Sequence, residues 1–151
     1  MVDNETFEIL VVEDDQPTFD LLHRLGDMLF PEATFVRATS PEETLHYLSD
    51  SVSKRPQLIL LDINLHQPTD GLTMLPELRT RFQGQVPIIM MTVSDSPAHV
   101  RQAYQTGATA FTIKPADLGG WKEYIEMLKT YWYEINLLPP TQFPPFRFLL
   151  Q

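Results

Sequence analysis

The stretch that decides the fold is FEILVVEDD, which runs from Phe7 to Asp15. It begins with a nearly continuous apolar run, rich in β-branched side chains, and ends in acidic residues. A short apolar run of this kind predicts a strand that is buried on both faces, as in a parallel sheet. A helix is predicted next, because Pro17 stands where proline is favoured in a first helical turn.

The same alternation of strand and helix continues along the chain. Further apolar runs of strand length lie at residues 34–38, 58–61, 87–91 and 110–113, and helical spacing of apolar residues follows each. The helices are predicted at residues 17–30, 41–48, 72–82, 97–106 and from about 117 to 137. Pro76 predicts a kink or a late start in the third helix. Strands alternating with helices in this way imply an α/β fold with a parallel sheet covered on both faces.

Size and composition exclude several classes of protein. The chain has 151 residues, the length of one ordinary domain. It contains no apolar run near the roughly 18 residues that a membrane span needs, and its acidic N-terminus lacks the layout of a secretory signal. The absence of cysteine excludes disulfides, thiol catalysis and thiolate metal sites, and it fits a cytoplasmic location. The net charge of −9 argues against binding DNA through a basic face.

Chemically active residues are predicted to gather at one edge of the sheet. In open α/β sheets, ligands bind beyond the carboxyl ends of the strands. The first predicted strand ends in Glu13-Asp14-Asp15, the third in Asp62, the fourth in Thr92 and the fifth in Lys114. Several carboxylates, one hydroxyl and one ammonium group are therefore expected in a single cleft.

Such a group of carboxylates needs positive charge. Two unit charges ~5 Å apart repel by about 3 kcal/mol at an effective dielectric constant near 20, so three carboxylates carry roughly 10 kcal/mol of repulsion. Lys114 offsets part of it, and a hard divalent cation such as Mg²⁺ offsets the rest. A carboxylate beside Mg²⁺, a lysine and a threonine hydroxyl suits phosphoryl transfer to the carboxylate. Asp15 is interpreted as the cap of the first helix and is left out of the metal shell.

At these residues the sequence resembles the response-regulator receiver domain (CheY-like) of two-component signalling. The matching pieces occur in the family's order across residues 7–136: ILVVEDD at 9–15, LILLDINL at 58–65, Asp70-Gly71, PIIMMT at 87–92, Gly107-Ala108 and Lys114-Pro115. The resemblance implies a doubly wound, flavodoxin-like sheet of five parallel strands in the order 2-1-3-4-5, flanked by five helices. It assigns residues 1–138 to the receiver domain and residues 139–151 to a C-terminal extension rich in proline and aromatic residues.

The resemblance also implies a role for each site residue. Asp62 is the phosphoacceptor, which takes its phosphoryl group from a phosphohistidine of a sensor histidine kinase or phosphotransfer protein. Asp14 binds Mg²⁺ directly, Glu13 binds it through water, and the main-chain carbonyl of Asn64 completes the shell together with Asp62.

The switch residues follow from the same resemblance. Thr92 is the switch hydroxyl, Lys114 pairs with the phosphoryl group, and Phe111 matches the aromatic ring that turns inward on activation. Without the resemblance, Phe111 is equally well interpreted as an ordinary apolar residue. The Lys114-Pro115 peptide bond is expected to be cis.

Two departures from the family pattern stand near the site. Asp62 and Gly71 are nine positions apart instead of the usual eight, and proline occurs at Pro68 instead of directly after Leu65. The extra residue is expected to reshape the rim while leaving the site intact. Val93 is bulkier than the small residue usual after the switch hydroxyl, and we expect it to narrow the access of phosphodonors.

The end of the chain resembles a narrower group within the family. Tyr131-Trp132-Tyr133-Glu134 and the later Leu137-Leu138-Pro139-Pro140 look like the close of single-domain regulators that partner bacterial phytochromes. The last helix and the tail of those proteins take part in homodimers, which predicts a homodimer and a phytochrome-type kinase here. The aromatic residues have an alternative interpretation, which is that they pack the last helix onto the sheet.

Two other functions remain open from the sequence. A haloacid-dehalogenase-like phosphatase also uses an aspartate nucleophile with Mg²⁺, but it needs a second carboxylate where this chain has Asn64. A receiver that is never phosphorylated, and that acts only in dimerisation or docking, is the other. The cognate kinase, the signal and the downstream target are not indicated by the sequence.

Overall fold

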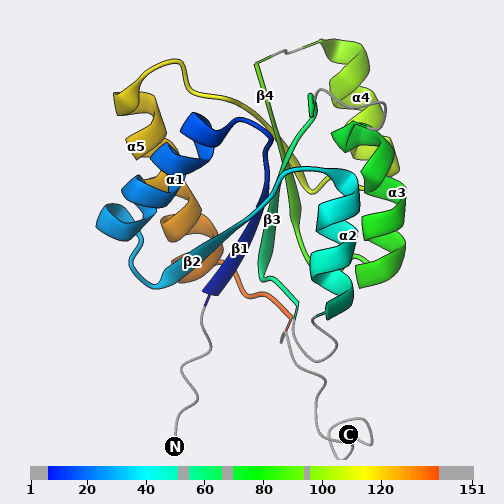
Figure 1. Ribbon diagram of the computed structural model, residues 1–151, viewed down its shortest axis with the longest axis horizontal. Coiled ribbons are helices and arrows are strands. Elements are labelled where there is room, and N and C mark those ends of the chain that lie inside the picture. Colours follow the sequence, from blue (N-terminus) through cyan, green and yellow to red (C-terminus); the bar gives the residue numbers. More distant parts are fainter. Residues whose placement is uncertain (1–6, 51–54, 66–69, 94–95, 140–151) are drawn as a thin grey trace, which may run out of the picture.

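In the described part of the chain, five parallel strands form one sheet in the order β2-β1-β3-β4-β5, as the resemblance implied. The computed structural model describes residues 7–50, 55–65, 70–93 and 96–139 (Figure 1). The strands are β1 (Phe7–Val12), β2 (Ala33–Ala38), β3 (Leu58–Asp62), β4 (Ile88–Thr92) and β5 (Ala110–Ile113). The helices are α1 (Gln16–Leu29), α2 (Pro41–Asp50), α3 (Gly71–Phe82), α4 (Pro97–Thr106) and α5 (Leu118–Met127), and α5 continues into a π-helix, η1 (Leu128–Ile135).

The helices cover the sheet on both faces (Figure 1). Helices α1 and α5 lie on one face, and α2, α3 and α4 lie on the other. Strand side chains alternate between the two layers, as the pleat requires. In β1, Ile9 and Val11 pack toward α1 and α5, whereas Leu10 and Val12 pack toward α2, α3 and α4. The central strands are therefore buried on both sides, which explains why they read as continuous apolar runs.

The pairing register brings the carboxyl ends of the strands to one edge. Val12 pairs with both Ala38 and Leu61, and Thr92 pairs with Ile113. Because the strands are parallel, the residues that follow them in sequence emerge together at this edge.

Local signals in the sequence fix the helix starts. Asp15 is the N-cap of α1 and accepts a hydrogen bond from the Thr18 backbone N–H at 3.0 Å, which is the role the sequence predicted. At the start of α2, the Ser40 hydroxyl accepts from the Glu43 backbone N–H at 3.1 Å. Pro76 predicted a kink or a late start of α3. The helix begins at Gly71 with Pro76 inside it, so the late start is wrong, and the kink stays a prediction.

The last helix differs in type from its prediction but ends near the predicted residue. Residues 128–135 form a π-helix, a rare arrangement, where a continuous α-helix was expected. Its aromatic residues divide between the two interpretations given above. Trp132 is buried, and the Tyr133 ring lies 5.4 Å from the rings of both Phe7 and Phe30, whereas Tyr131 is 49% exposed. Part of the cluster thus packs onto the sheet. Residues 140–151 of the predicted extension lie outside the described residues.

Within the described part of the chain, no helix has both the length and the apolar character needed to span a membrane.

Candidate functional site

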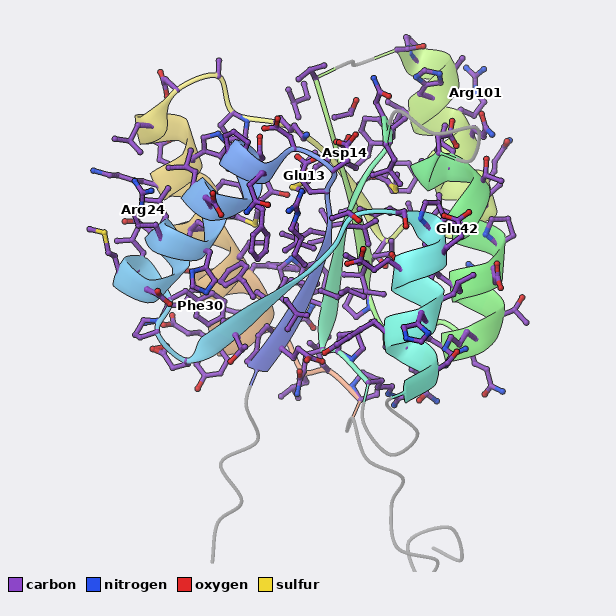
Figure 2. All side chains as sticks on the ribbon, in the orientation of Figure 1. Glu13, Asp14, Arg24, Phe30, Glu42 and Arg101 are labelled. Atoms are coloured by element: carbon purple, nitrogen blue, oxygen red, sulfur yellow. The ribbon has the colours of Figure 1, made fainter. Side chains whose placement is uncertain are left out.

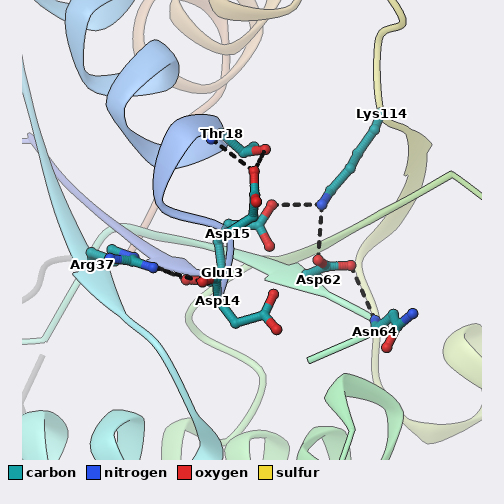
Figure 3. A network of polar contacts seen from close by, with 8 residues as sticks. All are labelled: Glu13, Asp14, Asp15, Thr18, Arg37, Asp62, Asn64 and Lys114. Atoms are coloured by element: carbon teal, nitrogen blue, oxygen red, sulfur yellow. Dashed lines mark hydrogen bonds and ion pairs between the residues drawn. The ribbon is translucent and has the colours of Figure 1, made fainter. Parts of the chain in front are cut away.

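Three carboxylates and one lysine lie together at the carboxyl edge of the sheet (Figure 3). Glu13 and Asp14 follow β1, Asp62 is the last residue of β3, and Lys114 follows β5. One carboxylate oxygen from each of the three acids lies within 4.8 Å of the others. The Lys114 ammonium donates to Glu13 Oε1 at 2.5 Å and to Asp62 Oδ2 at 2.8 Å. Residues from three separate strands therefore form one charged cluster.

This cluster is buried to an unusual degree for charged groups. Glu13 is fully buried, Asp62 is 5% exposed, and the Lys114 side chain is 14% exposed. Among the described residues other than aromatic ones, the only other buried polar side chains are those of Thr44 and Thr92. A buried charge costs free energy unless it is paired, so a cluster of this kind is more typical of a functional site than of a stabilising one.

The electrostatics of the site favour an additional positive charge. Burial, together with the neighbouring Asp62, raises the pKa of Glu13 to about 8, although Lys114 acts in the opposite direction. Burial alone would lower the pKa of Lys114, but its hydrogen bonds to Asp62 and Glu13 outweigh burial and raise it. Glu13 Oε2 is buried and has no hydrogen-bond partner. The single positive charge of Lys114 therefore does not balance the charge of three ionised carboxylates. In addition, Glu13 Oε2 remains an unsatisfied hydrogen-bond acceptor.

The residues present fit a divalent cation. Hard cations prefer oxygen ligands, and the carboxylates of Glu13, Asp14 and Asp62 supply them within a few ångströms of one another. When all four groups are ionised, the cluster carries two net negative charges, which a divalent cation neutralises. The orphaned Glu13 Oε2 is the kind of acceptor that a cation or its bound water satisfies.

Asp62 is held in place from both sides. Its Oδ2 accepts from Lys114, and its Oδ1 accepts from the Asn64 backbone N–H at 3.1 Å. Gly71, the first residue of α3, lies against the main chain of Asp62, and a Cβ added there would stand 2.1 Å from the Asp62 carbonyl oxygen. Only glycine permits this approach. The Asp62 carboxylate is thereby oriented by hydrogen-bond donors on two sides. Pro68, in the longer loop, lies outside the described residues.

The other predicted residues stand on the neighbouring strands. Thr92 ends β4 and is 4% exposed, and its carbonyl accepts from the Lys114 backbone N–H at 2.7 Å. Phe111 is half-buried and packs against the apolar cluster on the side of α3 and α4. Val93 is 82% exposed. The Thr92 switch role, the ring movement of Phe111 and the effect of Val93 on donor access stay predictions.

The prediction of a cis peptide at Lys114-Pro115 is wrong. No cis peptide bond occurs in the part of the chain that the structure describes, so this bond is trans. Proline lowers the preference for trans to only about 0.5–1 kcal/mol without reversing it, and the surrounding structure decides the isomer.

Sequence reasoning missed one residue beside the site. Arg37 on β2 donates hydrogen bonds to the main-chain carbonyls of Glu13 and Asp14. The available signal was weak: Arg37 is one of four basic residues in the first 75, and it stands near the end of a predicted strand.

Comparisons with known proteins agree with this geometry. The family model of the response regulator receiver domain matches residues 9–126. The chain is 27% identical over 139 residues to the probable methanogenesis regulatory protein FilR2 of Methanothrix harundinacea (strain 6Ac), with 89% of each chain covered.

Solved structures of response regulators have the same fold. The Mn²⁺-bound form of response regulator Rcp1 superposes with a TM-score of 0.77 at 23% identity, covering 88% of this chain and 99% of that one. The phosphorylated cyanobacterial phytochrome response regulator RcpA gives 0.79 at 22% identity, covering 88% and 98%. Response regulator RPA3017, in red light signaling of R. palustris, gives 0.77 at 26% identity, covering 89% and 99%.

Proposed function

The chain belongs to the response regulator receiver domain family, and from that premise we propose that it is a phosphorylation switch of two-component signalling. In this proposal Asp62 accepts a phosphoryl group from the phosphohistidine of a sensor kinase or phosphotransfer protein. The observation that carries it is the Asp62 carboxylate, buried beside Glu13 and Asp14 and bonded to the Lys114 ammonium.

In the transfer step, the protein supplies the nucleophile and the groups that balance charge. A carboxylate oxygen of Asp62 attacks phosphorus, the P–N bond of the phosphohistidine breaks, and the imidazole leaves with the electron pair and takes up a proton. Asp62 becomes an aspartyl phosphate. Lys114, already bonded to Asp62, balances charge on the transferring oxygens. Glu13, Asp14, Asp62 and the main-chain carbonyl of Asn64 would hold Mg²⁺, which supplies charge neutralisation for the phosphoryl oxygens when bound.

Phosphorylation then acts as a local change of charge. The aspartyl phosphate places up to two negative charges at the end of β3, where the carboxylate of Asp62 carries one. In the proposal, Thr92 donates a hydrogen bond to the phosphoryl group and the half-buried Phe111 ring turns inward, which alters the surface at β4 and β5. The protein's own catalysis is limited to accepting the group and slowly hydrolysing it.

Partners are proposed on several grounds. The net charge of −9 favours protein partners over DNA. A phytochrome-type kinase is supported by the sequence at Tyr131–Glu134 and by the likeness to a regulator of red light signaling. A homodimer through α5, η1 and the tail is supported by the exposure of Tyr131, Ile135 and Leu137, which are 49%, 67% and 93% exposed. A cysteine-free chain suits the cytoplasm, where such kinases act.

The dimer proposal is tested by mass. Light scattering measures the molar mass of the full chain and of a version shortened after Leu138, each with and without beryllofluoride, which mimics the phosphoryl group. A dimer that weakens on truncation supports the proposal, and a full chain that stays monomeric in both states contradicts it.

Phosphorylation is tested by incubation with acetyl phosphate and Mg²⁺, followed by intact mass measurement. We expect the wild-type protein to gain one phosphoryl group and Asp62→Asn to gain none. Asp15→Asn is the matched control, because Asp15 caps α1 nearby and asparagine caps equally well. Labelling that survives Asp62→Asn contradicts the proposal.

Two other outcomes identify the alternative functions. Steady hydrolysis of p-nitrophenyl phosphate, with many turnovers, would identify a phosphatase. Divalent cation binding without any phosphoryl adduct, from acetyl phosphate or from a phosphohistidine donor, would identify a docking module.

A further inference from the structure

Arg37 connects β2 to the loop that carries two of the acidic residues. Its Nε donates to the Glu13 carbonyl at 3.0 Å, and its Nη2 donates to the Asp14 carbonyl at 2.8 Å. Its Nη1 donates to the side-chain oxygen of Gln16, at the start of α1. One planar guanidinium group thus binds three residues between the end of β1 and the start of α1. Figure 3 shows its bonds to Glu13 and Asp14.

The guanidinium group is itself held in position. Arg37 pairs with Val11 across the sheet, and the Glu13 backbone N–H donates to the neighbouring Ala38 carbonyl at 3.0 Å. The guanidinium carbon also lies 5.9 Å from the ring centre of Phe19 on α1, within range of a cation–π contact. The main chain of Glu13 is therefore bonded to β2 through both its N–H and its carbonyl.

We propose that Arg37 is a positioning residue for the divalent cation, fixing the main chain of Glu13 and Asp14 so that their carboxylates stay close to Asp62. The inference rests on the proposed function, because it requires a cation at these carboxylates. Figure 3 places Arg37 on the opposite side of the turn from the carboxylates of Asp14 and Asp62. The arginine therefore acts on the site through the backbone of the ligands.

Charge and positioning predict opposite signs when Arg37 is removed. A positive charge near the acidic cluster repels a cation, so an arginine that acted only by its charge would weaken binding, and its loss would strengthen binding. An arginine that orients the ligands strengthens binding, and its loss weakens it. Substitutions of groups that orient metal ligands typically weaken metal affinity by about 10–100-fold.

The test measures Mn²⁺ binding by electron paramagnetic resonance of the free ion in the full chain. We expect Arg37→Met to bind Mn²⁺ about tenfold more weakly than the wild type. Arg24→Met is the matched control, because Arg24 is an exposed arginine that points outward from α1 (Figure 2). It removes the same charge and should leave the affinity within about twofold, as expected for a solvent-screened charge.

A second variant separates the charge of Arg37 from its shape. Arg37→Lys keeps the charge but loses the planar group that reaches two carbonyls at once, and we expect it to bind Mn²⁺ about threefold more weakly. Thermal unfolding without metal checks that each variant is folded. If one Arg37 variant does not fold, the Mn²⁺ affinity of the other Arg37 variant decides the test. A purely structural role predicts a lower melting temperature with unchanged Mn²⁺ affinity.

The possible outcomes are distinct. If Arg37→Met is folded and binds Mn²⁺ as tightly as the wild type, or more tightly, the inference is overturned. Wild-type affinity in Arg37→Lys would also overturn it, because the planar group that reaches two carbonyls would then not be needed to position the ligands. If the wild-type protein itself binds no Mn²⁺, the metal site of the proposed function fails, and that result is separate from any difference between variants.

Discussion

The middle of the central strands and their carboxyl ends are equally buried but chemically opposite. Leu10, Leu60 and Ile89, within β1, β3 and β4, are 1% exposed or less. Glu13 and Asp62, at or just beyond the ends of β1 and β3, are also 5% exposed or less, yet both carry carboxylates. Burial of apolar groups stabilises the fold, whereas burial of crowded carboxylates opposes it. Apolar burial in the middle of the sheet therefore stabilises the fold, and it offsets the destabilising burial of carboxylates at the edge.

The two regions should respond to substitution in opposite ways, and β3 contains both. Leu60→Ala removes a fully buried side chain and should lower the free energy of unfolding by about 2–5 kcal/mol. Asp62→Asn, two residues later, relieves repulsion among the acids and should leave the metal-free protein at least as stable as the wild type. Urea denaturation of both variants without metal measures the difference. An Asp62→Asn variant as unstable as Leu60→Ala would contradict the division between the two regions.

The next largest effect is a pH dependence that arises at the edge. Because burial raises the pKa of Glu13 from 4.5 to about 8, the native state keeps a proton that the unfolded chain releases. The stability linked to this proton is fully present below pH 4.5 and is lost as the pH rises through about 8. Metal-free unfolding, measured from pH 5 to 9, should therefore show falling stability.

Glu13→Gln is the control for this effect. It removes the titrating group and should flatten the difference between acid and alkaline conditions. Saturating Mg²⁺ should also stabilise the wild type more at pH 8.5 than at pH 6, because binding releases the proton. If the free energy of unfolding changes with pH in the same way in the wild type and in Glu13→Gln, the pKa of Glu13 is not raised by folding.

The backbone beneath Asp62 is expected to tolerate little change. In Gly71→Ala the new methyl group would stand 2.1 Å from the Asp62 carbonyl oxygen, so the loop or the strand end must move. Overpacking of this kind costs roughly 1–3 kcal/mol. The same displacement should slow labelling by acetyl phosphate. Gly119→Ala is the control, because its added Cβ meets nothing closer than 3.7 Å. Unchanged labelling in Gly71→Ala would show that Asp62 does not depend on this close approach.

The smallest effect is expected at a buried hydroxyl away from the edge. The Tyr124 hydroxyl on α5 lies 2.8 Å from Thr112 Oγ1, which also donates to the Met90 carbonyl at 2.7 Å. These groups are satisfied, unlike Glu13, so Tyr124→Phe should lower stability by only about 1 kcal/mol and leave labelling unchanged. Equilibrium unfolding and acetyl phosphate labelling measure the two effects. A loss of labelling would show that this network belongs to the site.

The fold and the location of the site could be predicted because both follow from strand ends. An apolar run stopped by Asp62 or by Glu13 predicts a buried strand and its terminus, and parallel pairing brings the termini to one edge. No contact between distant residues had to be known in detail. This is why the parallel sheet and the set of carboxylates could be stated from the residues alone, whereas the strand order was taken from the family resemblance.

The remaining features depend on contacts that the sequence does not reveal. Arg37 reaches Glu13 and Asp14 only because β2 pairs with β1, and its hydrogen bonds span more than 20 residues. The π-helical turn at residues 128–135 differs from an α-helix in hydrogen-bond register, which the side-chain pattern does not specify. The cis isomer at Lys114-Pro115 was taken from the family resemblance, and this bond is trans in the structure.

We propose that Glu13, Asp14, Asp62 and Lys114 form one cation-dependent phosphoacceptor site. Fluorine NMR of beryllofluoride, a mimic of the phosphoryl group, tests it most directly. We predict protein-bound fluorine signals in the wild type when Mg²⁺ is present, and their absence without Mg²⁺ or in Asp62→Asn. Bound signals that persist in Asp62→Asn, or that form equally well without a divalent cation, would contradict the claim.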